Sequence, residues 1–222
     1  MEEHIVRILN IESVTHDVKR FQVEKPSGYT FVPGQATEVS INKPELKEEK
    51  RPFTFTCLTT APYLEFTIKI YPSHNGITNE LGKLNQGDEL ILRDVWGAIN
   101  YKGEGVFIAG GAGITPFISI LRDLKIKDKL SGNILIFGNK KKADIILERE
   151  LKGLLGKSFI NILSEELAEG YYNGFISEAL LRAVIKDFNT NFYVCGPPPM
   201  MDSVMKGLGN IGVEKNSITL EL

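Results

Sequence analysis

The pattern of apolar residues changes near residue 100, and this change constrains the fold more than any other feature. Before it, short runs of alternating apolar and polar residues are separated by turn residues, which is typical of antiparallel strands in a barrel or sandwich. After it, compact apolar runs alternate with helical segments, which predicts a parallel sheet covered on both faces. We therefore expect two domains: an antiparallel β-barrel over residues 1–99 and an α/β domain with a parallel sheet over residues 100–222.

The individual elements are predicted from the same patterns. In the first domain we expect strands in residues 4–15, 19–28, 36–41, 54–58, 64–70 and 89–93, and a short helix at 77–84. In the second we expect strands at 105–109, 133–137, 159–163, 192–195 and 217–220, and helices at 115–124, 146–155, 177–186 and 198–208.

Charge and cysteine content exclude several classes of protein. The 222 residues include 26 basic and 28 acidic ones, so no basic surplus points to nucleic acid or an anionic membrane. The two cysteines, Cys57 and Cys195, form no C-x-x-C pair, which argues against a disulfide framework and cannot supply the four thiolates of a common iron–sulfur cluster. Because no run of ~18 apolar residues and no signal peptide is evident, we expect no membrane span and a cytoplasmic location.

A glycine-rich turn follows the first strand of the second half. Its residues run from Ala109 through three glycines and Ile114 to Thr115 and Pro116. The glycines let a backbone approach a phosphate closely, Thr115 suits a helix N-cap, and Pro116 suits the first helical position. The helix start would then offer free N–H groups to an anion. A tight strand–helix turn without a ligand is the alternative.

The end of the next strand bears on the choice of dinucleotide. Gly138 and Asn139 are followed by Lys140, Lys141 and Lys142. A carboxylate near this point typically binds the ribose of NAD, whereas a cation can accommodate the 2′-phosphate of NADP. The lysines therefore favour NADPH, with a solvated lysine loop as the alternative.

A second motif follows the strand at 192–195. Cys195 and Gly196 precede three prolines and Met200, and they lie at the carboxyl end of a parallel strand, where open sheets bind ligands. Gly196 would let a ring pass close to the backbone, and the prolines would start the next helix. Cys195 could equally be a small buried residue.

The first half carries a motif of its own. Arg51, Phe53 and Thr54 bring a cation, an aromatic ring and a hydroxyl to one strand, which could pair with a phosphate, stack on a planar ring and hydrogen-bond a ring nitrogen. An ordinary amphipathic strand is the alternative. Downstream, residues 74–79 place Gly76 and Thr78 at an expected helix start, which also suits a phosphate.

These motifs, in this order, resemble those of the ferredoxin–NADP reductase superfamily, which includes flavodoxin reductases and the reductase domains of oxygenase systems. Arg51-Pro52-Phe53-Thr54 is similar to the family's flavin motif, Gly110–Pro116 to its pyrophosphate motif, and Cys195–Met200 to its nicotinamide motif. Phe31–Gln35 is similar to its turn before a barrel strand. The resemblance implies a flavin-binding barrel and a NAD(P)-binding α/β domain.

The resemblance also implies roles for single residues. Thr54 would hydrogen-bond the flavin nitrogen that takes the hydride, and Cys195 would border the nicotinamide; these are the two predicted catalytic residues. The predicted cofactor-binding residues are Arg51, Pro52, Phe53, Thr54, Gly76, Ile77 and Thr78 for the flavin, and Gly110, Gly111, Gly113, Ile114, Thr115, Pro116, Lys140, Cys195, Gly196 and Pro197 for the dinucleotide. No residue is predicted to bind a metal.

The expected activity is electron transfer from NADPH or NADH through flavin to a one-electron carrier such as ferredoxin or flavodoxin. FAD is favoured over FMN because the segment 76–79 offers a second phosphate site. Alternatives are a reductase that feeds an oxygenase, a haem protein or free flavin, an electron-transfer subunit of a larger complex, and a nucleotide sensor without catalysis. Many relatives end in an aromatic residue that covers the flavin, whereas residues 220–222 here are Leu, Glu and Leu.

Overall fold

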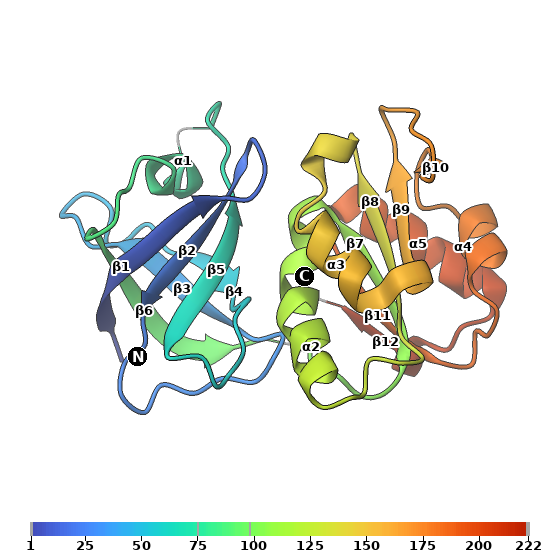
Figure 1. Ribbon diagram of the computed structural model, residues 1–222, viewed down its shortest axis with the longest axis horizontal. Helices are drawn as coiled ribbons and strands as arrows, with labels where there is room; N and C mark the ends of the chain where they lie inside the picture. The colour runs from blue at the N-terminus through green and yellow to red at the C-terminus, as the bar shows by residue number, and fades with distance from the viewer. Residues whose placement is uncertain (1, 75, 98, 221–222) are drawn as a thin grey trace. The chain divides into compact units, whose positions relative to one another are not determined.

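The computed structural model describes residues 2–74, 76–97 and 99–220, and the chain forms two compact units (Figure 1). The described residues up to Asn100, together with Thr115–Asp123, form the first unit. Tyr101–Ile114 and the described residues from Leu124 onward form the second. The predicted departure at the C-terminus falls on Glu221 and Leu222, which lie outside the described residues. None of the helices in the described ranges is long and apolar enough to cross a membrane.

The first unit is built on an antiparallel sheet, as the alternating runs predicted. Its strands are β1 (His4–Ser13), β2 (Val18–Glu24), β3 (Ala36–Ile41), β4 (Arg51–Thr54), β5 (Tyr63–Lys69) and β6 (Glu89–Trp96), in the order β4-β3-β6-β1-β2-β5. An isolated antiparallel bridge joins Phe55, just after β4, to Phe66 of β5. This bridge connects the two outer strands of the sheet, so the sheet curves toward a barrel.

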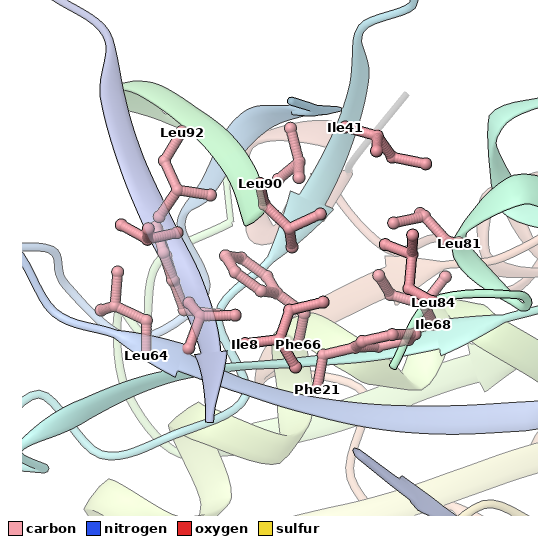
Figure 2. Packing of buried hydrophobic residues seen from close by; sticks show 14 of the residues in the cluster. Ile8, Phe21, Ile41, Leu64, Phe66, Ile68, Leu81, Leu84, Leu90 and Leu92 are labelled. Atoms are coloured by element: carbon pink, nitrogen blue, oxygen red, sulfur yellow. The ribbon is translucent and has the colours of Figure 1, made fainter. Parts of the chain in front are cut away.

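The core of this unit lies inside the curved sheet. Phe21 of β2 and Phe66 of β5 are opposite each other in register, and both are fully buried. Figure 2 shows them in one cluster with Leu81 and Leu84, which come from the short helix α1 (Ile77–Leu81) and the turn after it. Full burial of a phenylalanine contributes roughly 1.5–3 kcal/mol to folding. The barrel core therefore fixes α1 as well as the strands.

The second unit is built on a parallel sheet, also as predicted. Its strands are β7 (Gly105–Gly110), β8 (Ile134–Asn139), β9 (Phe159–Leu163), β10 (Tyr172–Asn173), β11 (Asn191–Cys195) and β12 (Ile218–Leu220), in the order β10-β9-β8-β7-β11-β12. Its helices are α3 (Glu148–Leu155), α4 (Glu178–Val184) and α5 (Pro198–Ile211), with 3-10 turns η1 (Gly111–Ile114), η2 (Lys142–Asp144), η3 (Gly156–Ser158) and η4 (Lys215–Ser217).

Helices cover both faces of the parallel sheet. Leu181 of α4 and Val204 of α5 are buried in one cluster with Ile108 of β7, so these helices pack on the same face. Figure 1 shows α3 on the opposite side of the sheet from α5. The remaining helix, α2 (Thr115–Ile126), follows η1, and most of it belongs to the first unit.

Several elements differ from the sequence prediction in their bounds, and β10 in its existence. The strand expected at 54–58 is β4 at Arg51–Thr54, because β4 is an edge strand and tolerates Pro52, which cannot donate to a ladder. Strand β10 was not predicted, because two residues are too few to show the alternation of apolar and polar side chains that marks a strand. The helix expected at 77–84 ends at Leu81, before Gly82.

Candidate functional site

The order of the strands marks one point on the parallel sheet as a ligand site. The chain leaves β7 toward β8, β9 and β10, and then returns to β11 on the other side of β7. Open parallel sheets bind ligands where the strand order reverses in this way, at the carboxyl ends of the strands. Gly110 ends β7 and Cys195 ends β11, and Cys195 pairs in register with Ala109. The two motifs found in the sequence therefore meet at the reversal point.

Three glycines let these two motifs touch through their backbones. A Cβ on Gly113 would lie 2.3 Å from the carbonyl oxygen of Cys195. A Cβ on Gly110 would lie 2.5 Å from Sδ of Met200, and one on Gly196 would lie 3.0 Å from the backbone nitrogen of Gly110. These glycines are required by the packing of one motif on the other, in addition to any approach of a phosphate.

Gly111 differs from the other glycines of the turn. It adopts φ +51°, in the left-handed region, and a Cβ there would meet no atom within 4 Å. Open space at this backbone fits the approach of a ligand. The structure also inserts the 3-10 turn η1 before the helix, so Thr115 is the first residue of α2 instead of its N-cap. The prediction that Thr115 is the N-cap is therefore wrong, because the 3-10 turn over Gly111–Ile114 runs directly into the helix.

The motif after β11 starts a helix, as predicted. Pro197 is the N-cap of α5 in an extended conformation, and Pro198 occupies the first helical position. The side chain of Cys195 is half-buried, and its carbonyl lies against Gly113. The structure therefore brings Gly110, Gly113, Cys195, Gly196 and Pro197 together at one edge of the sheet.

The neighbouring strand end holds a donor that the sequence analysis did not single out. Asn139 is the last residue of β8, its side chain is 9% exposed, and its Nδ2 has no hydrogen-bond partner among the described residues. Its carbonyl oxygen accepts the backbone N–H of Ser164 at 3.0 Å, which holds the β8 end against the β9 end. A buried amide without a partner costs free energy, so this donor points to a bound group or a water. A lone asparagine gives no periodic signal, which explains why it was missed.

The lysines after β8 are engaged with carboxylates. Lys140 forms an ion pair with Glu165 at 2.9 Å, and the backbone N–H of Lys142 donates to Oε2 of Glu166 at 2.7 Å. The hydrogen bond to Glu165 raises the pKa of Lys140 above its ordinary value. Lys142 also lies over the ring of Tyr171, at 5.5 Å from its centroid. Of the three lysines, Lys140 is therefore ion-paired through its ammonium, and carboxylates accept from the backbone at the other two positions.

In the barrel unit, the flavin-like motif forms the edge strand β4. Arg51 is exposed, and its Nη1 donates to the backbone oxygen of Lys50 at 2.7 Å. Phe53 is half-buried against the barrel core, and Thr54 is buried and pairs with Ala36 of β3. The exposed guanidinium of Arg51 is thus accessible to an anion in solution, while the buried side chain of Thr54 is held against the core.

Strand β3 connects this motif to the second predicted phosphate site. β4 pairs with β3, and α1 lies against β3 on the same unit. Gly76 is the N-cap of α1, has no side-chain cap, and leaves open space around its Cα. Ile77 is buried, while Thr78 is half-buried. The first N–H groups of a helix have no partner within it, so they are available to an anion.

A buried arginine supports the segment before this motif. Arg93 of β6 is 1% exposed, and its guanidinium bonds Glu3 at 2.8 Å, Oγ of Ser40 at 3.0 Å and the carbonyl of Lys47 at 3.2 Å. Its bond to Lys47 holds the loop that leads into Arg51. Arg93 was not predicted, because a single arginine in an alternating strand is normally an outward-facing residue.

Comparisons with known proteins agree with this arrangement. Residues 107–206 match the family described as the oxidoreductase NAD-binding domain. The chain is 29% identical over 230 residues to the reductase component of propane 2-monooxygenase from Rhodococcus jostii, covering 96% of this chain and 61% of that protein. It is 31% identical over 186 residues to NADH-cytochrome b5 reductase 1 from Eremothecium gossypii, covering 76% of this chain and 64% of that protein. The chain therefore spans less than two thirds of either relative.

Two solved structures share the fold over the whole chain. One is a ferredoxin NADP+ reductase from Neisseria gonorrhoeae with bound FAD and NADP, with a TM-score of 0.87, 21% identity and coverage of 100% of this chain and 98% of that one. The other is the pair of CS-b5R domains of human Ncb5or in the NAD+ form, with a TM-score of 0.84, 26% identity and coverage of 100% and 70%.

Proposed function

Because the chain has the fold of the ferredoxin–NADP reductase superfamily, as its motifs predicted, we propose that it is a flavin-dependent oxidoreductase that passes electrons from a nicotinamide dinucleotide to a one-electron acceptor. The observation that carries this proposal is the meeting of the two glycine motifs at the reversal point of the parallel sheet. The open backbone at Gly111 and the unpartnered amide of Asn139 lie at the same edge and fit a dinucleotide.

The barrel residues fit a flavin. Arg51 would bind its phosphate with an exposed guanidinium, Phe53 would stack on the ring, and Thr54 would hydrogen-bond the ring nitrogen from a buried, fixed position. Gly76, Ile77 and Thr78 would donate backbone N–H groups to a second phosphate, which favours FAD over FMN. Bound flavin would supply the hydride acceptor and the means of releasing electrons one at a time.

The dinucleotide would rest on the second unit. Gly110, Gly111, Gly113 and Ile114 would face the pyrophosphate, and the helix start at Thr115 and Pro116 follows them. Cys195, Gly196 and Pro197 would border the nicotinamide. None of these groups has to act as an acid or base, since the cofactors carry the chemistry and the protein orients them.

The carboxylates gathered after β8 favour NADH over NADPH. The sequence alone favoured NADPH because of its lysines, but Lys140 is paired with Glu165, and Glu166 also lies at this edge. A 2′-phosphate would have to displace a carboxylate, whereas a ribose hydroxyl can accept from Asn139. We expect Glu165→Gln to improve kcat/KM for NADPH relative to NADH. Equal use of both dinucleotides by the unmodified protein would refute this preference.

The experiment that tests the function is a visible spectrum of the purified protein before and after NADH. A yellow protein that bleaches supports the proposal, and a protein that binds nucleotide without flavin supports a nucleotide sensor. Acid release of the cofactor followed by chromatography distinguishes FAD from FMN. Arg51→Ala should lower flavin content, whereas Arg7→Ala, which removes an exposed arginine of β1, should not.

The acceptor class is the second question. The reductase component of propane 2-monooxygenase and the cytochrome b5 reductases are named for their acceptor systems, which keeps an oxygenase or a haem protein as the alternative to ferredoxin or flavodoxin. Turnover with ferredoxin, flavodoxin, a b-type cytochrome and free flavin, measured side by side, decides among them.

A further inference from the structure

A buried ionic network joins helix α2 to the strands of the barrel unit. Glu65 of β5 has a side chain only 4% exposed, and its Oε1 accepts from Nη1 of Arg122 at 2.8 Å and from Oγ1 of Thr56 at 2.9 Å. Nη1 of Arg122 also donates to the backbone oxygen of Thr56 at 2.6 Å. One guanidinium therefore binds a buried carboxylate of β5 and the backbone just after β4 at once.

A second bond fixes the same helix one turn earlier. The backbone N–H of Gly34 donates to Oγ of Ser119 at 3.1 Å, and Ser119 is fully buried. Ser119 and Arg122 are three residues apart, so both lie on one face of α2. Gly34 adopts φ +97° in the turn before β3. The first turns of α2 are thus held at two points, consistent with the membership of Thr115–Asp123 in the barrel unit.

The ends of this network are the two segments that the proposed function uses. Thr115 and Pro116 open α2 directly after the glycine turn. Thr56 lies two residues after Thr54, and its backbone N–H donates to the carbonyl of Glu65 at 2.8 Å. A shift of α2 along its axis would break the bonds of Arg122 to both Glu65 and Thr56.

We propose that Arg122 and Glu65 are positioning residues that hold the helix start at Thr115 and Pro116 in a fixed register with Thr54. This inference rests on the proposed function, because it assigns the register to the alignment of the dinucleotide with the flavin. Misplacement of reacting groups by about 1 Å can lower a rate by about 100-fold, even where binding is retained. The pair should therefore act on the rate of hydride transfer more than on dinucleotide affinity.

The test separates positioning from plain stabilisation. In the FAD-loaded protein, stopped-flow bleaching by NADH gives a limiting rate and an apparent Kd. Arg122→Met leaves the buried Glu65 with only the weaker contact to Arg20 among the arginines that meet it in the described residues, at 3.9 Å from Nε to Oε2, so both the thermal midpoint and the limiting rate should fall. The double variant Glu65→Leu with Arg122→Met removes both charges and should restore the thermal midpoint, while the limiting rate stays at least about tenfold low and the Kd changes by less than about threefold.

Two further variants complete the design. Arg122→Lys keeps the charge but loses the planar fork, so it should retain flavin and show an intermediate loss of rate. Lys125→Met removes an exposed base from the same helix and should match the unmodified protein. Recovery of the limiting rate together with the thermal midpoint in the double variant would overturn the inference. Failure of the unmodified protein to bleach with either NADH or NADPH would overturn the proposed function, and this inference with it.

Discussion

The thiol of Cys57 should make the free energy of unfolding fall between pH 9 and about 11. Cys57 follows β4, is 3% exposed and packs in the barrel core. Burial raises the pKa of this thiol from its ordinary value of 9.0 to about 11, and the nearby charge of Glu65 acts in the same direction. The folded protein therefore keeps a proton that the unfolded chain releases at lower pH.

The size of the effect follows from the difference between the two pKa values. Below pH 9 the thiol is protonated in both states and the free energy of unfolding does not depend on it. Between pH 9 and about 11 the unfolded chain loses the proton first, so stability falls by ~1.4 kcal/mol per pH unit. The total loss from this group is about 3 kcal/mol, and above pH 11 it no longer increases.

Urea unfolding at pH 8, 9, 10 and 11 measures this loss directly. Cys57→Ala is the matched control, because every other ionisable group is present in both proteins and cancels in the difference. The variant should be less stable at pH 8 and should lose less stability on going to pH 11, by about 3 kcal/mol. Parallel curves for the two proteins, with a constant difference in free energy at every pH, would refute the buried-thiol reasoning.

Other predictions follow from single contacts. Gly113→Ala should destabilise the second unit by about 1–3 kcal/mol and abolish dinucleotide binding, because its Cβ would lie 2.3 Å from the Cys195 carbonyl; calorimetry and NADH titration check this. Gly111→Ala should cost about 1–2 kcal/mol, since only its left-handed φ is at stake; retained dinucleotide binding by Gly113→Ala would contradict the packing argument. Arg93→Met should destabilise the barrel by about 1–3 kcal/mol, since it leaves Oγ of Ser40 and the carbonyl of Lys47 without their donor, and should also lower flavin content; unchanged urea midpoints would show that the bonds of Arg93 are dispensable.

The sequence predicted the fold because its signals are local. The alternating residues of β2 indicate that one face of the strand is buried, and the continuous apolar run of β7 indicates that both faces are. Neither inference depends on which strands lie next to it. The exceptions have equally local causes. The strand was expected at 54–58, and the strand order shows that β4 lies at an edge, where one side of the strand needs no donor and Pro52 is tolerated.

The candidate site was predicted where it depends on glycine and proline, and missed where it depends on distant pairs. The turn after β7 and the motif after β11 can be recognised from their glycine and proline content. The structure adds that Gly110, Gly113 and Gly196 allow the two motifs to pack against each other. Asn139 carries no such signal, and its importance rests on a buried donor without a partner.

The pair of Glu65 and Arg122 shows why this limit is physical. The two residues are 57 positions apart, and each alone looks like an ordinary surface charge in an alternating strand or an amphipathic helix. The buried carboxylate has Arg20 and Gln22 of β2 beside Oε2, while Oε1 accepts from Thr56 and from Arg122, and the contact with Arg122 exists only once α2 is folded against β5. A charged pair of this kind therefore specifies how the helix docks, which a pattern of apolar residues cannot do, since an apolar face permits sliding and a directional bond does not.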